Sequence, residues 1–118
     1  MRSIGIVGCG AIGRELLRAA AAGRLPVPVA GVASRTEASA RAFLATLPSP
    51  PPLLSLQELC LRAGLIVEAA GVPAVAPLAE AAFAAGADLM VISAGALLDQ
   101  PQVIARARAA GRRLFVPS

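Results

Sequence analysis

The chain has 118 residues, which is enough for one domain with a hydrophobic core. Hydrophobic residues make up 57% of it and charged residues only 15%, which excludes an intrinsically disordered chain. The net charge of +4 comes from scattered arginines, and there is no Trp or Tyr to stack on bases, which argues against nucleic-acid binding. The absence of His excludes His-based acid–base catalysis and metal sites with His ligands in this chain.

The first predicted element is a strand over residues 3–7, apolar throughout, as is typical of a parallel strand covered on both faces. It leads into the turn Gly8-Cys9-Gly10-Ala11-Ile12-Gly13 and an amphipathic helix over 11–22. A strand, a G-x-G-x-x-G turn and a helix in this order indicate dinucleotide binding. The glycines permit a tight turn, approach of a pyrophosphate and close helix packing, and the helix N-terminus attracts the phosphates. A glycine-rich turn without a ligand is the alternative.

A second strand is predicted over 29–33 and a helix over 37–47, and the tip Ser34-Arg35-Thr36 joins them. NAD-preferring sites usually carry an acid at this tip, which binds the ribose 2′-hydroxyl. Hydroxyls and a guanidinium instead attract a 2′-phosphate. The sequence therefore predicts NADP as the preferred cofactor, with NAD as the other possibility. A solvent-exposed Arg35 without this role is the alternative interpretation.

The proline-rich stretch 48–52 predicts a stiff turn rather than a linker, because the α/β pattern resumes at once. A short third strand is predicted over 53–54. Ser55 and Glu58 have the spacing of a capping box at the start of a helix over 56–62. Strands are then predicted over 65–69, 88–92 and 113–116, and helices over 74–85 and from 99 or 100 to 110.

Predicted strands and helices alternate from one end of the chain to the other. This alternation predicts one α/β domain over residues 1–118, with helices on both faces of a parallel sheet. Six strands, with the glycine turn after the first, predict a Rossmann-type doubly wound sheet of order 3-2-1-4-5-6. The nicotinamide end of a dinucleotide is expected at the turns after the fourth and fifth strands, where small residues leave room for the ring. Ordinary tight turns are the alternative. Glu68 ends the fourth strand, and its carboxylate either takes part in chemistry or accepts hydrogen bonds from nearby backbone N–H groups.

The two cysteines, Cys9 and Cys60, lack the spacing of a metal site. A disulfide at Cys9 would obstruct the glycine turn, so both are expected to be reduced thiols in a cytoplasmic protein. The apolar run before Cys9 is too short for a signal peptide. Acids, glycines and prolines interrupt the apolar region 65–83, so neither a membrane nor a nucleic acid is expected as a partner.

Segments 8–13, 66–70, 88–97 and 111–118 resemble the cofactor-binding half of L-aspartate dehydrogenases, and the similarity covers essentially the whole chain. The resemblance implies hydride transfer from L-aspartate to NAD(P), which gives an imine that hydrolyses to oxaloacetate and ammonia or enters NAD synthesis. The family's cofactor residues correspond here to Gly8, Gly10, Ala11, Ile12, Gly13, Ser34, Arg35, Ala69, Ala70 and Ser93. NAD-preferring relatives commonly have an acid at the tip of the second strand, and this chain departs from that pattern.

In the family, a second domain with the catalytic His follows the point where this sequence ends, so no catalytic residue is expected here. This chain alone is expected to bind the cofactor without turnover, and to self-associate or to require that missing domain. A stand-alone NADP-binding sensor or subunit, and the nucleotide domain of a homoserine dehydrogenase-like enzyme or a sugar oxidoreductase, are the alternatives. The full set of predicted cofactor contacts is Gly8, Cys9, Gly10, Ala11, Ile12, Gly13, Ser34, Arg35, Thr36, Ala69, Ala70, Gly71, Ser93 and Ala94.

Overall fold

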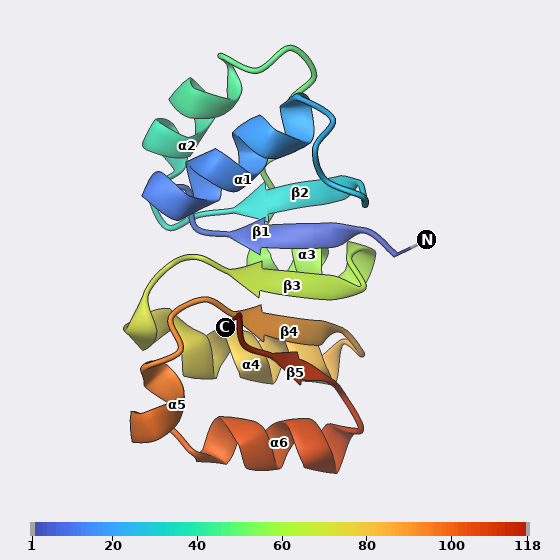
Figure 1. Ribbon diagram of the computed structural model, residues 1–118, viewed down its shortest axis with the longest axis vertical. Helices are drawn as coiled ribbons and strands as arrows, with labels where there is room; N and C mark the ends of the chain where they lie inside the picture. The colour runs from blue at the N-terminus through green and yellow to red at the C-terminus, as the bar shows by residue number, and fades with distance from the viewer. Residues whose placement is uncertain (1, 118) are drawn as a thin grey trace.

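A computed structural model describes residues 2–117 of the chain. Its centre is a five-stranded parallel sheet in the order β2-β1-β3-β4-β5 (Figure 1). The strands are Ile4–Val7 (β1), Val29–Ala33 (β2), Leu65–Glu68 (β3), Asp88–Val91 (β4) and Leu114–Phe115 (β5). The predicted α/β class and the parallel, doubly wound arrangement are confirmed.

The third strand predicted at 53–54 is reduced to a single parallel bridge between Val32 and Leu53. The Val32 N–H donates to the carbonyl of Pro52 at 2.9 Å, and the Leu54 N–H donates to the carbonyl of Val32 at 2.8 Å. Residues 50–52 are all prolines without N–H donors, so the pairing cannot extend toward the N-terminus. The prediction of six strands is therefore wrong in number. The bridge nevertheless lies beside β2, so the order 3-2-1-4-5-6 is preserved.

The helices fill the connections between the strands, as alternation predicts. They are Ala11–Ala21 (α1), Glu37–Leu44 (α2), Leu56–Arg62 (α3), Val75–Ala84 (α4), Ala96–Asp99 (α5) and Gln102–Ala110 (α6), with a 3-10 turn at Val72–Ala74 (η1). Helices α1 and α2 lie over β1 and β2 on one face, whereas α3 and α4 lie on the opposite face (Figure 1). Helix α6 packs against α4 beside them. No helix within residues 2–117 has the length and apolar character needed to cross a membrane.

Two hydrophobic clusters, one on each face of the sheet, form the core. Leu17 of α1 and Phe43 of α2 belong to the first cluster, and Leu78 of α4 belongs to the second. Along β3, Ile66 joins the second cluster and its neighbour Val67 joins the first, because successive side chains of a strand point to opposite faces. This two-sided burial explains why the strands read as continuous apolar runs.

Two predicted helices differ from the observed ones. The helix predicted over 37–47 ends at Leu44, and the helix predicted from 99 or 100 is divided into α5 and α6 at Gln100 and Pro101. The predicted capping box is confirmed: Ser55 Oγ accepts from the Glu58 N–H at 3.1 Å, and the Ser55 N–H donates to Glu58 Oε1 at 3.3 Å. This local pattern stabilises the start of α3.

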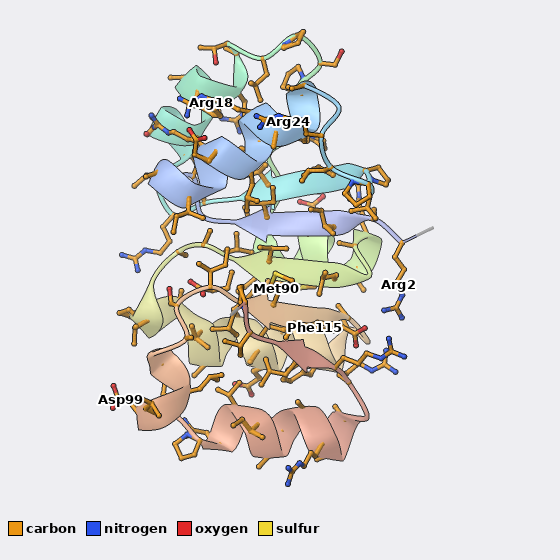
Figure 2. The ribbon with its side chains drawn as sticks, in the orientation of Figure 1. Arg2, Arg18, Arg24, Met90, Asp99 and Phe115 are labelled. Carbon is orange, nitrogen blue, oxygen red and sulfur yellow. The ribbon has the colours of Figure 1, made fainter. Side chains whose placement is uncertain are left out.

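One face of the sheet is covered only in part. On the side of α1 and α2, no helix of the described residues 2–117 lies in front of β4 and β5 (Figure 1). Met90 and Phe115 are register neighbours on this side and are labelled in Figure 2. Phe115 is 40% exposed. The domain therefore presents apolar side chains on one open face.

Candidate functional site

The loop after β1 contains three glycines with different structural requirements. Gly8 has a φ of +107°, and a Cβ there would meet the carbonyl of Ala69. A Cβ on Gly13 would collide with the carbonyl of Gly8. At Gly10 the φ is −89°, and a Cβ would meet nothing within 4 Å. The fold itself requires Gly8 and Gly13, whereas the open space at Gly10 fits the approach of a pyrophosphate.

Helix α1 begins directly at this open space. Its N-cap, Gly10, makes no side-chain capping bond, and its first turn has no acidic residue. The Arg14 N–H donates to the carbonyl of Gly10 at 2.9 Å, while the N–H groups before it start the helix without a carbonyl one turn earlier. The Arg14 guanidinium donates to the carbonyl of Cys9 at 3.0 Å and to Ser39 Oγ at 3.1 Å. Helix dipole and guanidinium together give this loop a positive potential suited to an anion.

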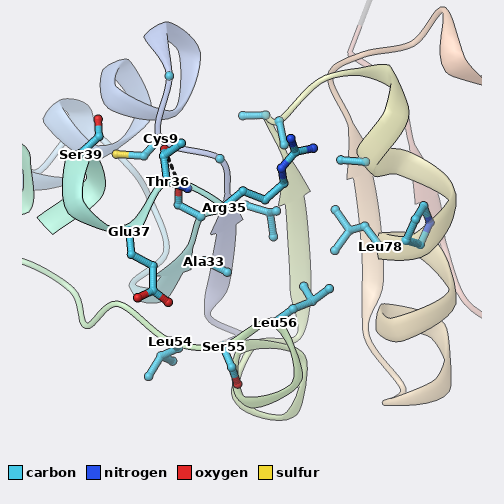
Figure 3. Close-up of a pocket in the computed structure, with 18 of the residues that line it drawn as sticks. Cys9, Ala33, Arg35, Thr36, Glu37, Ser39, Leu54, Ser55, Leu56 and Leu78 are labelled. Atoms are coloured by element: carbon cyan, nitrogen blue, oxygen red, sulfur yellow. Dashed lines mark hydrogen bonds between the residues drawn. The ribbon is translucent and has the colours of Figure 1, made fainter.

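A cavity of about 820 Å³ lies at the carboxyl ends of β1, β2 and β3 (Figure 3). This volume is within the range of small-molecule sites. Eight of the predicted contacts line the cavity: Gly8, Cys9, Gly10, Ser34, Arg35, Thr36, Ala69 and Ala70. Six predicted contacts do not line it: Ala11, Ile12, Gly13, Gly71, Ser93 and Ala94. The structure thus brings the glycine loop, the β2 tip and the loop after β3 to one site.

The other lining residues were not among the cofactor contacts predicted from the sequence. They are Val7, Arg14, Ala33, Glu37, Ser39, Leu54, Ser55, Leu56, Pro73, Ala74, Pro77 and Leu78. The segment 54–56 could have been inferred, because it follows a predicted strand and ligands cross the carboxyl ends of strands. Pro77 and Leu78 belong to α4, and no local signal marks them as pocket residues.

The tip of β2 presents its polar groups in an ordered turn. The Thr36 N–H donates to Ser34 Oγ at 3.2 Å, and the two hydroxyl oxygens lie 3.3 Å apart. The Arg35 side chain extends across the cavity, whereas the Glu37 carboxylate, which also lines the cavity, points away from Arg35, toward Ser55 (Figure 3). Two hydroxyls and a guanidinium are therefore available here to an anionic group.

Glu68, at the end of β3, is completely buried. Its carboxylate accepts hydrogen bonds from the N–H groups of Ala70 (2.9 Å) and Gly71 (2.8 Å), and from the N–H (2.8 Å) and hydroxyl (2.9 Å) of Ser93. The interpretation of Glu68 as an acceptor for nearby backbone N–H groups is confirmed. Within residues 2–117 no group of three or more His, Cys, Asp or Glu could hold a metal ion.

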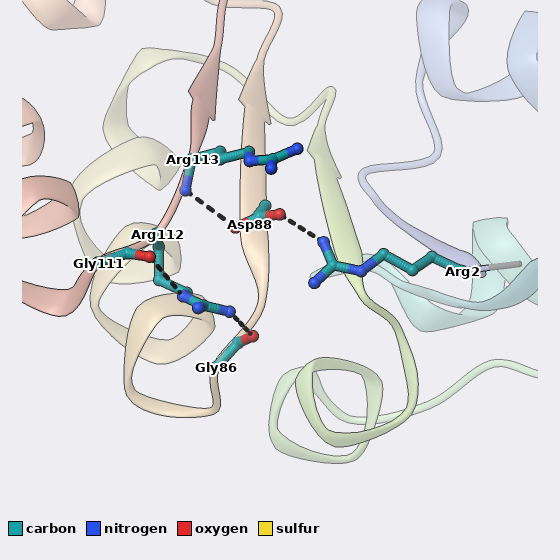
Figure 4. A network of polar contacts seen from close by, with 6 residues as sticks. All are labelled: Arg2, Gly86, Asp88, Gly111, Arg112 and Arg113. Atoms are coloured by element: carbon teal, nitrogen blue, oxygen red, sulfur yellow. Dashed lines mark hydrogen bonds and ion pairs between the residues drawn. The ribbon is translucent and has the colours of Figure 1, made fainter.

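A second polar cluster lies at the opposite edge of the sheet, where the strands begin (Figure 4). Asp88 pairs with the Arg2 guanidinium at 2.5 Å and accepts from the Arg113 N–H at 2.9 Å. Burial by itself raises the pKa of Asp88, but the hydrogen bonds from Arg113 and Arg2 and the charges of Arg2 and Arg112 outweigh it and lower the pKa overall. This cluster ties together three elements and is remote from the cavity.

The sequence of this chain is similar to those of known dehydrogenases. Residues 8–117 match the family model described as homoserine dehydrogenase, NAD binding domain. The chain is 42% identical over 100 residues to the L-aspartate dehydrogenase of Methanocella arvoryzae, an alignment that covers 85% of this chain and 37% of that protein. The chain spans less than half the length of the curated relatives it matches.

Solved structures show the same architecture. A UDP-N-acetylglucosamine 3-dehydrogenase from Acidithiobacillus ferrooxidans superposes with a TM-score of 0.81 at 20% identity, over 98% of this chain and 37% of that one. A biliverdin reductase from Synechocystis, solved with biliverdin and NADP+, superposes with a TM-score of 0.75 at 26% identity, over 97% of this chain and 37% of that one. The first shows the fold alone, and the second is also similar in sequence.

Proposed function

The chain belongs to the family of NAD-binding domains described for homoserine dehydrogenase, and we propose that it serves an oxidoreductase that transfers a hydride between L-aspartate and NAD(P). The observation that carries this proposal is the open space at Gly10, directly before the uncapped N-terminus of α1. The similarity to L-aspartate dehydrogenases supports the choice of substrate. Residues 1–118 then form one dinucleotide-binding domain.

The residues of this chain bind and orient the cofactor. The first-turn N–H groups of α1 would hold the pyrophosphate. Leu54 and Leu56 line the cavity beside the β2 tip, where an adenine ring would find apolar contacts. When bound, NAD(P) supplies the hydride acceptor. We assign no catalytic residue to this chain, since Glu68 is fully engaged with backbone and hydroxyl donors. The catalytic groups would lie in the further length that the relatives have.

We propose that NADP is preferred to NAD. The 2′-phosphate carries a negative charge that the Arg35 guanidinium and the Ser34 and Thr36 hydroxyls can bind. Glu37, the carboxylate nearest in sequence, points away from Arg35 (Figure 3). A carboxylate at the tip itself, which would favour the 2′-hydroxyl of NAD, is absent from residues 33–36.

Titration calorimetry with NADPH and NADH tests this preference. We expect NADPH to bind at least about tenfold more tightly, and Arg35→Ala to remove about 1.5–3 kcal/mol from NADPH binding while changing NADH binding little. Arg24→Ala is the matched control, because Arg24 is exposed and does not line the cavity. Tighter binding of NADH by the parent chain would contradict the preference.

The family description favours one second candidate, an enzyme that acts on L-homoserine. Assays of an enzyme that contains this domain together with its catalytic part, with L-aspartate and L-homoserine as competing substrates, distinguish the two. We also propose a reducing, cytoplasmic setting, because Cys9 and Cys60 are both buried free thiols.

A further inference from the structure

Glu68 connects two loops that are 25 residues apart in the sequence. One oxygen of its carboxylate accepts from Ala70 and Gly71 in the loop after β3, and both oxygens accept from Ser93 in the loop after β4. The backbone adds a further link, since the Ile92 N–H donates to the carbonyl of Glu68 at 3.2 Å. A single side chain therefore fixes the relative position of both loops.

In this arrangement the buried Glu68 carboxylate and the groups that donate to it all have hydrogen-bond partners. A buried carboxylate without a cation is costly unless hydrogen bonds compensate it. Glu68 has 0% exposure, forms no ion pair with another residue of the described chain, and receives four hydrogen bonds. Conversely, the N–H groups of Ala70, Gly71 and Ser93 would lose their acceptor if the carboxylate were removed. These N–H groups lie in part-buried loops, so without their acceptor they would turn toward other partners or water and the loops would rearrange.

The position of these loops determines what they affect. In a sheet of this topology a dinucleotide crosses the carboxyl ends of the strands, with its adenosine half toward β2 and its other half toward β3 and β4. Ala69 and Ala70 line the cavity, whereas the Ser34–Thr36 tip lies on the far side of β1. Glu68 therefore acts on one half of the site only.

We propose that Glu68 is a positioning residue that, through Ala70, Gly71 and Ser93, holds the loops after β3 and β4 in the geometry that receives the nicotinamide half of the cofactor. This inference rests on the proposed cofactor function. It assigns to Glu68 no contact with the cofactor and no proton transfer. Its consequence is that Glu68 contributes to the affinity for the complete dinucleotide and not to the affinity for the adenosine half.

Two ligands separate these contributions: NADP+ and adenosine 2′,5′-bisphosphate, which lacks the whole nicotinamide half. Glu68→Gln replaces one carboxylate oxygen by an NH2 donor at nearly unchanged size, so at least one of the four donors loses its acceptor. Ser93→Ala removes a single 2.9 Å bond at an otherwise similar residue. Glu80→Gln makes the same chemical change on the exposed face of α4, where Glu80 pairs only loosely with Arg106 at 3.4 Å. Calorimetry with each ligand is combined with thermal unfolding of each variant.

We expect Glu68→Gln to weaken NADP+ binding by about tenfold or more and Ser93→Ala to weaken it by a smaller factor. Both substitutions should change the binding of adenosine 2′,5′-bisphosphate by less than about twofold. Glu80→Gln should change neither. The inference would be overturned if the binding of both ligands were weakened equally, or if a folded Ser93→Ala chain bound NADP+ as tightly as the parent chain. If the parent chain binds neither ligand, the proposed function fails instead. If Glu68→Gln does not fold, Ser93→Ala alone decides between these outcomes.

Discussion

Gly8, Gly10 and Gly13 belong to one motif, yet each is needed for a different reason. Gly8 adopts a positive φ beside the Ala69 carbonyl, and Gly13 lies against the Gly8 carbonyl, so contacts within the chain require both. Gly10 has an ordinary φ and open space where its side chain would be. At the scale of single residues, contacts within the chain therefore account for Gly8 and Gly13, and the proposed pyrophosphate contact accounts for Gly10.

Alanine substitutions should separate the two effects. We expect Gly13→Ala to lower the free energy of unfolding by about 1–3 kcal/mol, because its Cβ would overlap a backbone carbonyl. Gly10→Ala should change that free energy by no more than about 1 kcal/mol, while it weakens NADPH binding about tenfold by obstructing the pyrophosphate. Urea unfolding and calorimetric titration measure the two quantities. Normal NADPH binding by Gly10→Ala would show that the phosphates do not approach this loop.

Asp88 acts at the scale of elements, because its carboxylate joins the starts of β4 and β5 to the segment before β1 (Figure 4). The hydrogen bonds and positive charges around it hold its pKa below the ordinary value, although burial opposes them. A carboxyl group whose pKa is lower in the folded than in the unfolded state stabilises the fold above its unfolded pKa. That stabilisation is lost as the pH falls through the folded pKa.

Asp88→Asn should lower the free energy of unfolding at pH 7 by about 1–2 kcal/mol, a modest amount because Arg2 is 60% exposed and water screens the pair. The difference from the parent chain should shrink below about pH 4, where the unfolded carboxyl group takes up its proton. Urea unfolding at pH 7, 5 and 3 measures this dependence. Glu15→Gln is the control, since Glu15 is in an exposed pair with Arg18. A difference that stays constant down to pH 3 would contradict the role of the charge.

At the scale of the whole molecule, the sheet face in front of β4 and β5 stands out because no helix of the described residues covers it. Phe115 is exposed there, and Met90 lies beside it (Figure 2). Exposed apolar area of this kind favours association. The self-association expected from the composition thus has a candidate surface, and it stays a prediction.

Sedimentation velocity over a range of concentrations checks that prediction. We expect the weight-average sedimentation coefficient to rise with protein concentration and Phe115→Ser to suppress the rise, because the hydroxyl makes burial of the face unfavourable. Leu61→Ser is a matched control on α3, on the opposite side of the sheet, where Leu61 is 78% exposed. A single monomeric species at every concentration would refute self-association through this face.

Much of this domain could be predicted because the signals lie within a few residues of one another. The glycine loop with its strand and helix, the Ser55–Glu58 capping box and the alternation of strands and helices are all patterns of this kind. The strand predicted at 53–54 was wrong although its cause is also local. The prolines directly before this apolar pair have no N–H donors and leave only one bridge to Val32.

Local pattern along the chain was sufficient for the class of fold, the order of its strands and the position of the glycine loop between β1 and α1, since periodicity, capping and glycine spacing depend on near neighbours. The tertiary structure alone determined which distant residues line the cavity and which loops are in contact. It brought Pro77 and Leu78 of α4 to the cavity and joined Glu68 to Ser93. These contacts connect residues far apart in sequence, and their distances depend on how the helices pack against the sheet, which no short stretch of sequence encodes.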